Sequence, residues 1–169
     1  MGSLGSPDAG EIIIFGEDAA ADLISYRRKR VGFVFQFFNL ISALTMLENV
    51  MLPMDIDAVP SPRKHSRAVE LPDRTGIDAR LKKAKADKIS GGEKQRVAIA
   101  KAVANDPDII LADEPTGNLD SATGRVVVDI LGGLAREDNK CVVIVTHDEG
   151  ILDVADRSFH MMDGRLSAL

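Results

Sequence analysis

The hydrophobic residues of the chain gather into short runs that are separated by longer polar or amphipathic stretches. Four runs have the length of buried strands and are bounded by polar or turn residues, at residues 11–15, 31–35, 108–112 and 141–145. A fifth region, residues 157–166, predicts two shorter strands around the pair Asp163-Gly164, which is typical of a tight hairpin turn. The first ten residues are rich in Gly, Ser and Pro, and they predict a loop.

Helical patterns lie between these runs. Residues 90–104 predict a helix that begins with a capping box, in which Ser90 and Glu93 can satisfy each other's backbone N–H groups. Residues 122–136 and 149–155 predict two more helices, and residues 45–52 predict one that ends near Pro53. Because a proline inside a helix costs about 3 kcal/mol, the helical stretch 67–75 is expected to break at Pro72.

The alternation of strands and helices predicts an α/β fold with a mostly parallel sheet flanked by helices. The polar middle of the chain does not follow this alternation. We interpret it as a small helical insert of short helices and turns, between Gln36 and the helix that starts at Ser90. The basic cluster at residues 27–30 precedes a strand, and we interpret it as a solvated turn.

Composition narrows the classes of protein that need to be considered. The chain has 169 residues, of which 45% are hydrophobic and 28% charged, with a net charge of -5. This mild acidity gives no electrostatic argument for nucleic acid or an anionic membrane as the main partner. The single cysteine excludes an internal disulfide and fits a reducing cytosol. The sequence contains neither a membrane-spanning apolar run nor a secretory-signal pattern, so direct membrane insertion is not expected.

Three polar clusters follow predicted strands directly. Gln36 follows the run at 31–35, Asp113 and Glu114 follow the run at 108–112, and His147 follows the run at 141–145 after one threonine. Ligands of open parallel sheets bind at the carboxyl ends of the strands, so these side chains are expected to share one crevice. A carboxylate pair of this kind suits Mg²⁺ binding by Asp113 and proton acceptance by Glu114. A single cluster of this kind is more often part of a polar surface loop, by roughly three to one, and it is the coincidence of three that favours a site.

The start of the helix at Ser90 is a second candidate site. Ser90, Gly91 and Gly92 leave backbone N–H groups accessible at a helix N-terminus, where a phosphate can bind. The alternative is an ordinary helix cap. Four of the six phenylalanines, at positions 33, 35, 37 and 38, surround Gln36, and we interpret them as core packing.

These segments together resemble the nucleotide-binding subunit of ABC transporters. The segment ISGGEKQRVAIAKAVANDPDIILADEPTGNLDSATG is similar to the family's signature, Walker B strand and D-loop, in family order. VGFVFQFFNL resembles the Q-loop, VTHD the switch histidine, and ADRSFHMMDGRL the closing strands. The amino-acid sequence of these segments is most similar to that of the subgroup that serves macrolide exporters and lipoprotein-release complexes.

The resemblance implies a P-loop NTPase-like fold and an ATPase. Asp113 and Gln36 would contact Mg²⁺, and Gln36 would also sense the γ-phosphate of ATP. Glu114 would act on the attacking water, and His147 would contact the γ-phosphate. Ser90, Gly91 and Gly92 would close on ATP held by a second subunit, and Asp120 would cross the dimer interface.

The resemblance also implies partners and a location. The subunit would dimerise, or pair with a complete subunit, and its helical insert, at about residues 40–92, would receive a transmembrane permease. It would then be cytoplasmic and peripheral on the inner face of the membrane, powering export.

One family motif is not found. The phosphate loop (Walker A) needs G-x-x-x-x-G-K-[ST], and the nearest match, GSPDAG at residues 5–10, continues with Glu11-Ile12. SLGSPDAGEI is similar to the family segment after the phosphate-loop helix. Residues 1–169 are therefore expected to be one partial nucleotide-binding domain, truncated at its N-terminus, that binds ATP weakly by itself.

Two alternative functions stay open. The chain could be a non-catalytic interaction module that supplies the signature to a complete subunit. It could also be a soluble ABC-type ATPase of DNA repair or translation, although the sequence has no long coiled-coil insert, no tandem second domain and no basic surface pattern.

Overall fold

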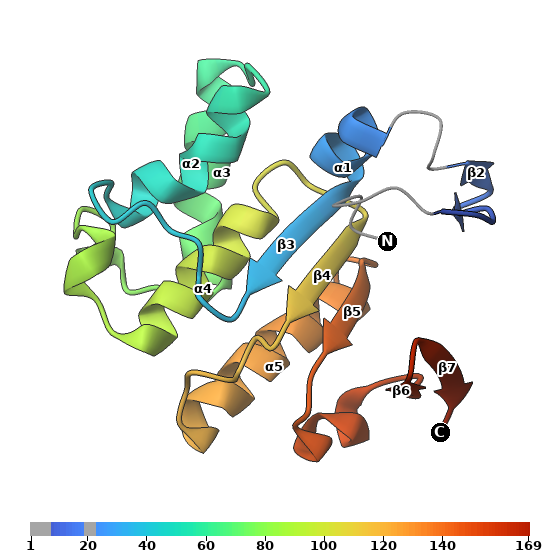
Figure 1. Cartoon of the computed structure of the whole chain (residues 1–169). Coiled ribbons are helices and arrows are strands. Elements are labelled where there is room, and N and C mark those ends of the chain that lie inside the picture. Colours follow the sequence, from blue (N-terminus) through green and yellow to red (C-terminus); the bar gives the residue numbers. More distant parts are fainter. Residues whose placement is uncertain (1–7, 19–22) are drawn as a thin grey trace.

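A computed structural model describes residues 8–18 and 23–169 of the chain (Figure 1). Its centre is a parallel sheet of three strands in the order β3-β4-β5, formed by Val31–Phe35, Ile109–Asp113 and Cys141–Val145. Val34 and Ile110 of this sheet are fully buried, as expected of strands covered by helices. The predicted α/β class and the three central strands are therefore confirmed.

Helices α4 and α5 pack against the sheet. Helix α4 (Gly91–Ala102) lies along β3, and helix α5 (Ser121–Arg136) connects β4 to β5 and packs against β5. Gly32 allows β3 and α4 to approach closely, because a Cβ at this position would lie only 2.4 Å from the carbonyl oxygen of Ala102. Both helices occupy the predicted segments.

The segment between β3 and α4 is helical, and α4 separates it from the sheet (Figure 1). It contains α2 (Met46–Ile56), α3 (Ser61–Arg74) and two short 3₁₀ helices, Ala79–Leu81 and Ala86–Lys88. Thr45 begins α2 with a capping box, as Ser90 begins α4. Buried side chains of this segment join the main core, and they include Met46, Val50, Met54, Ala68 and Leu71.

Both proline predictions for this segment were wrong. Helix α2 continues past Pro53 to Ile56, and α3 continues past Pro72 to Arg74. Met54 and Leu71, the neighbours of the two prolines, are almost completely buried. We infer that this burial outweighs the lost backbone hydrogen bond, since tertiary packing supplies most helical stability in proteins.

The basic cluster lies in a helix and not in a turn. Helix α1 spans Leu23–Arg30, so the four basic residues occupy its last turn. Positive charges at a helix C-terminus are favoured by the helix dipole. Two of them also pair with acids elsewhere, Arg28 with Asp57 at 2.7 Å and Arg30 with Asp108.

Small elements complete the described chain. The strand predicted at residues 11–15 is a short hairpin, β1 (Ile13–Ile14) paired with β2 (Glu17–Asp18). The predicted helix at 149–155 is a 3₁₀ helix, Glu149–Val154. The C-terminal hairpin is confirmed as β6 (Phe159–Met162) and β7 (Arg165–Ala168), with positive φ at both turn residues, Asp163 and Gly164.

Two predictions concern the chain's start and membrane contact. Residues 1–7 of the predicted N-terminal loop lie outside the described residues. Within 8–18 and 23–169, no helix combines the length and apolarity that a membrane crossing requires.

Candidate functional site

The strand register brings the three polar clusters to one edge of the sheet. Phe35 pairs with Asp113, and Asp113 pairs with Val145, so the three strands end side by side. Gln36, Glu114 and Thr146 therefore follow their strands at the same level. The three clusters therefore share one edge of the sheet, as the sequence predicted.

Glu114 and His147 are in direct contact at this edge. The His147 Nδ1 atom lies 2.7 Å from Oε1 of Glu114, and the His147 backbone N–H donates to the same oxygen at 3.1 Å. The hydroxyl of Thr146 donates to the other carboxylate oxygen at 3.2 Å. The carboxylate is thus held on both oxygens, while the imidazole is 82% exposed.

The contact shifts both ionisation equilibria toward charge. Desolvation raises the pKa of Glu114, but the hydrogen bonds from His147 and Thr146 and the imidazolium charge together bring that pKa below its ordinary value. The hydrogen bond to Glu114, and then its negative charge, raise the pKa of His147. Glu114 is accordingly an ionised carboxylate at neutral pH, which is the state that can accept a proton.

Asp113 and Gln36 lie at the same edge of the sheet as this pair. Asp113 is exposed at the end of β4, and Gln36 lies half-buried after β3. A Cβ on Gly117 would lie 2.8 Å from Nε2 of Gln36, so this glycine lets the amide rest against the loop that follows Glu114. Asn118 Nδ2 donates to the Gln36 backbone carbonyl at 2.9 Å and fixes the same loop to β3.

These oxygens fit a magnesium ion that completes its shell with other oxygens. Carboxylate and amide oxygens are ligands that Mg²⁺ accepts, and it keeps several water or phosphate ligands at nucleotide sites. No group of three or more His, Cys, Asp or Glu side chains forms a complete metal site within the residues described. Magnesium binding by Asp113 and Gln36 therefore stays a prediction.

The start of α4 is the second candidate site, and its capping box is formed as predicted. The Ser90 hydroxyl accepts from the Glu93 backbone N–H, and the Glu93 carboxylate accepts from the Ser90 backbone N–H at 2.7 Å. Gly92 has a clear packing reason, because a Cβ there would lie 2.3 Å from Cγ2 of Thr123 on α5. Gly91 faces the loop at Leu119, where a Cβ would meet an ordinary contact at 3.6 Å.

Asp120 caps helix α5. Its carboxylate accepts from the Thr123 backbone N–H at 3.0 Å and from the Thr123 hydroxyl at 2.7 Å. These bonds, the side-chain one first, hold the pKa of Asp120 below its ordinary value. The carboxylate of Asp120 is thus ionised at neutral pH and oriented by its own helix. The residue is also exposed.

The structure adds polar residues that the sequence reading missed. Thr146 and Asn118 make the bonds described above, and Gln95 of α4 donates from Nε2 to the Pro115 carbonyl at 2.7 Å, from a fully buried position. The signal for Thr146 was its place directly before His147, and the signal for Asn118 was its place in the segment that resembles the D-loop, two residues before Asp120. Gln95 gave no comparable signal, since it stands inside an otherwise ordinary helix.

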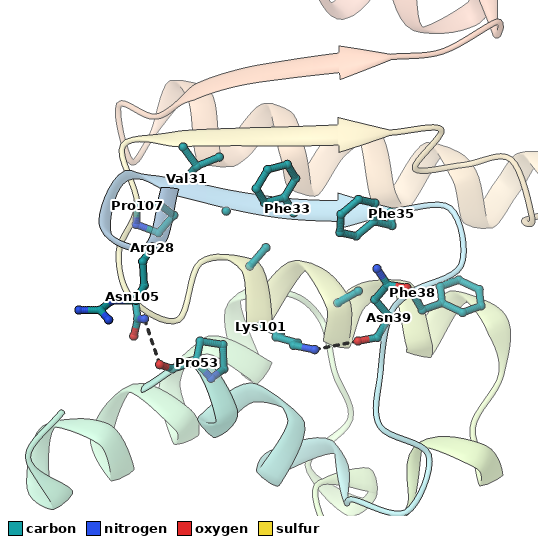
Figure 2. Close-up of a pocket in the computed structure, with 13 residues that line it drawn as sticks. Arg28, Val31, Phe33, Phe35, Phe38, Asn39, Pro53, Lys101, Asn105 and Pro107 are labelled. Atoms are coloured by element: carbon teal, nitrogen blue, oxygen red, sulfur yellow. Dashed lines mark hydrogen bonds between the residues drawn. The ribbon is translucent and has the colours of Figure 1, made fainter. Parts of the chain in front are cut away.

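The phenylalanine prediction was wrong in part. Phe37 is 75% exposed, and the rings of Phe33 and Phe35 stack with centroids 5.5 Å apart instead of filling the core. A pocket of about 300 Å³ lies between β3, α4 and Pro53 of α2 (Figure 2). Its lining includes Phe33, Phe35 and Phe38. Lys101 crosses this pocket and donates to the Asn39 carbonyl at 2.7 Å.

Comparison with known proteins identifies relatives along nearly the whole chain. The family model described as ABC transporter matches residues 2–117. The lipoprotein-releasing system ATP-binding protein LolD of Bacteroides fragilis is 44% identical over 98% of this chain and 78% of its own length. LolD 2 of Chlorobaculum tepidum is 41% identical over 99% of this chain and 71% of its own length.

Solved structures give the same result. The ATP-binding cassette of Methanocaldococcus jannaschii, a dimer in a post-hydrolysis state with ADP and Pi, superposes with a TM-score of 0.85 and 41% identity. That match covers 99% of this chain and 76% of the cassette. A Clostridium perfringens protein that is part of an ABC transporter complex has a TM-score of 0.88 at 27% identity, over 98% and 67% of the two chains. The predicted truncation of this chain stays a prediction.

Proposed function

Because the chain belongs to the ABC transporter ATP-binding family, we propose that it acts as the ATP-binding and ATP-hydrolysing subunit of an exporter and drives export through a membrane partner. Turnover requires the phosphate loop (Walker A), a motif that is not found in residues 1–169. The contact between Glu114 and His147 at 2.7 Å is the observation that supports this proposal, since it brings together the two residues that we propose as proton acceptor and phosphate contact. The 44% identity with a lipoprotein-releasing ATPase supports export, and a lipid-modified substrate in particular.

Each residue at this edge has a separate task in the proposed reaction. The ionised carboxylate of Glu114 orients the attacking water and takes its proton. His147, with a raised pKa, presents a positively polarised ring to a phosphoryl oxygen. Asp113 and Gln36 would hold Mg²⁺, which when bound supplies positive charge against the phosphate oxygens.

A second subunit completes the proposed site. The first turn of α4 presents backbone N–H groups with Ser90 at its tip, and such a helix N-terminus favours a phosphate group. We propose that Ser90, Gly91 and Gly92 face ATP held by the partner, with exposed Asp120 at the same interface. The dimeric state of the Methanocaldococcus jannaschii cassette supports this arrangement.

We further propose that the pocket of Figure 2 receives a short segment of a permease. Its floor is apolar, with Val31, Phe33 and Phe35 of β3, and Lys101 and Asn39 stand at one side. An amphipathic helix end from the membrane partner would match this combination. Docking there would hold the chain on the inner face of the membrane.

The test is the hydrolysis of Mg-ATP by the full chain, alone and mixed with the complete Bacteroides fragilis relative. If this chain hydrolyses ATP, the Glu114→Gln variant lowers its rate of ATP hydrolysis by 100-fold or more. This decrease corresponds to a loss of about 2.7 kcal/mol of transition-state stabilisation. Glu137→Gln, on the surface after α5, is the matched control and leaves the activity unchanged. Full activity of Glu114→Gln overturns the role of Glu114.

The interaction-module function is a second candidate, and the fully formed first turn of α4 favours it. The same mixture separates the two. A module that lends its signature stimulates a relative whose own signature serine is replaced, and Ser90→Arg in this chain removes that stimulation. Glu114→Gln in this chain has no effect in that case.

A further inference from the structure

The side chain of Gln95 links the helix that begins at Ser90 to the loop that carries Glu114. Gln95 is 0% exposed, and its Nε2 donates to the Pro115 carbonyl at 2.7 Å across 20 residues of sequence. Its Oε1 is buried without a hydrogen-bond partner. A buried acceptor without a hydrogen bond costs free energy. A buried amide of this kind therefore generally has a structural or functional reason, and the bond to Pro115 indicates what that reason is.

Pro115 depends on this bond because of its chemistry. A proline has no N–H group, so its carbonyl is its only backbone group for hydrogen bonding. Pro115 is a buried residue, and the Gln95 amide satisfies its carbonyl. The peptide between Pro115 and Thr116, one residue after Glu114, is therefore tied to α4.

Glu114 itself has an unusual backbone. Its φ is +45°, in the left-handed region that non-glycine residues seldom adopt. Two backbone bonds hold it there, from the Glu114 N–H to the Val145 carbonyl at 2.8 Å and from the Gly117 N–H to the Glu114 carbonyl at 3.1 Å. The Gln95 bond to the next residue is a third restraint and comes from a different element.

We propose that Gln95 is a positioning residue that keeps Glu114 in the left-handed conformation from which its carboxylate reaches His147. Gln95 donates to the Pro115 carbonyl and hydrogen-bonds neither of the two side chains, so it acts through Pro115. Because Gln95 lies on the same helix as Ser90, the orientation of Glu114 is fixed relative to α4. The consequence for hydrolysis rests on the proposed function, whereas the positioning itself does not.

The test compares Gln95→Met with Asn49→Leu in the full chain without nucleotide. Asn49 is the matched control, since it is also a buried helical amide that donates to loop carbonyls, those of Ile41 and Thr45 at 3.0 Å, but in α2. Amide hydrogen exchange is followed residue by residue. In Gln95→Met, the Glu114 and Gly117 amides exchange at least tenfold faster, whereas in Asn49→Leu they keep their wild-type rates.

A spectroscopic readout distinguishes positioning from packing. At fixed pH, the ¹⁵N resonance of His147 Nδ1 reports its hydrogen bond to Glu114, and Glu114→Gln gives the resonance without the carboxylate. Gln95→Met shifts the His147 resonance toward that of Glu114→Gln, and Asn49→Leu does not. If Gln95→Met does not fold, Gln95→Asn, whose amide is one methylene shorter, is measured in its place with the same expectation.

Either of two results overturns the proposal. One is an unchanged His147 resonance in the Gln95 variant. The other is an equal acceleration of exchange throughout the chain, which indicates global destabilisation only. Because no nucleotide is present, these results are independent of whether the chain hydrolyses ATP.

Discussion

Gly92 provides the sharpest test of packing in the candidate site. An alanine Cβ at position 92 would lie 2.3 Å from Cγ2 of Thr123, where ordinary carbon contacts lie at 3.4–4 Å. Either α4 and α5 must separate by about an ångström or the Thr123 rotamer must change, and overpacking of this kind costs about 1–3 kcal/mol. Alanine gains about 1 kcal/mol over glycine inside a helix. We therefore expect Gly92→Ala to destabilise the fold by about 0–2 kcal/mol.

Thr123→Ser provides the matched background. Serine removes Cγ2 and keeps the hydroxyl that donates to Asp120. Without the methyl group, Gly92→Ala retains only its gain in helix propensity, so it should stabilise the Thr123→Ser protein by up to about 1 kcal/mol. The double-mutant cycle then gives a coupling energy of about 1–3 kcal/mol between the two positions.

Urea unfolding of the four proteins measures this coupling. Additive effects within about 0.5 kcal/mol, or a Gly92→Ala protein that is more stable than wild type, would refute the packing argument. The result also has a functional meaning. The double variant Gly92→Ala, Thr123→Ser could fold well and yet no longer support ATP hydrolysis by a partner subunit. That result would show that position 92 must lack a side chain for a second reason.

Three further predictions concern stability. Glu114 has a lowered pKa and stabilises the fold above its ordinary value of 4.5, and His147 has a raised pKa and stabilises it below its ordinary value of 6.5. The pair should therefore contribute most between these values, and a stability difference between wild type and His147→Gln that is flat from pH 4 to 9 in urea titrations would contradict this. Asp120→Ala removes the cap of α5 and should cost about 1 kcal/mol, a decrease in Tm of about 2–4 °C by calorimetry. Leu131→Ala empties a fully buried position and should cost about 2–5 kcal/mol in urea unfolding, whereas Phe37→Ala, at 75% exposure, should change stability by less than about 0.5 kcal/mol.

Local patterns were sufficient for the elements that position the site. The β-branched run at Cys141–Val145 and the capping box of Ser90 each predict one structure from neighbouring residues alone. The meeting of Glu114 and His147 followed from a rule about parallel sheets, and the register bears it out.

The remaining features depend on contacts between distant residues. Helix α3 includes Pro72 because Leu71 and Ala68 are buried against the core, which a proline rule cannot anticipate. Gln95 has the same limitation, since its partner Pro115 lies 20 residues away and only the packing of α4 brings them together. The exposure of Phe37 is also a property of the assembled surface.

The connectivity of the sheet also has a kinetic consequence. The pairing of β3 with β4 joins residues that are about 78 positions apart in the sequence. The pairing of β4 with β5 joins residues that are only 32 positions apart, and the same separation holds for the hydrogen-bonded residues Glu114 and Thr146. Closing the longer loop costs about 0.8 kcal/mol more chain entropy. We expect β4, α5 and β5 to form first during folding, with high φ-values at Leu131 and low ones at Val34. The edge that gathers Gln36 with Glu114 would then be completed late, after the whole helical segment has been placed.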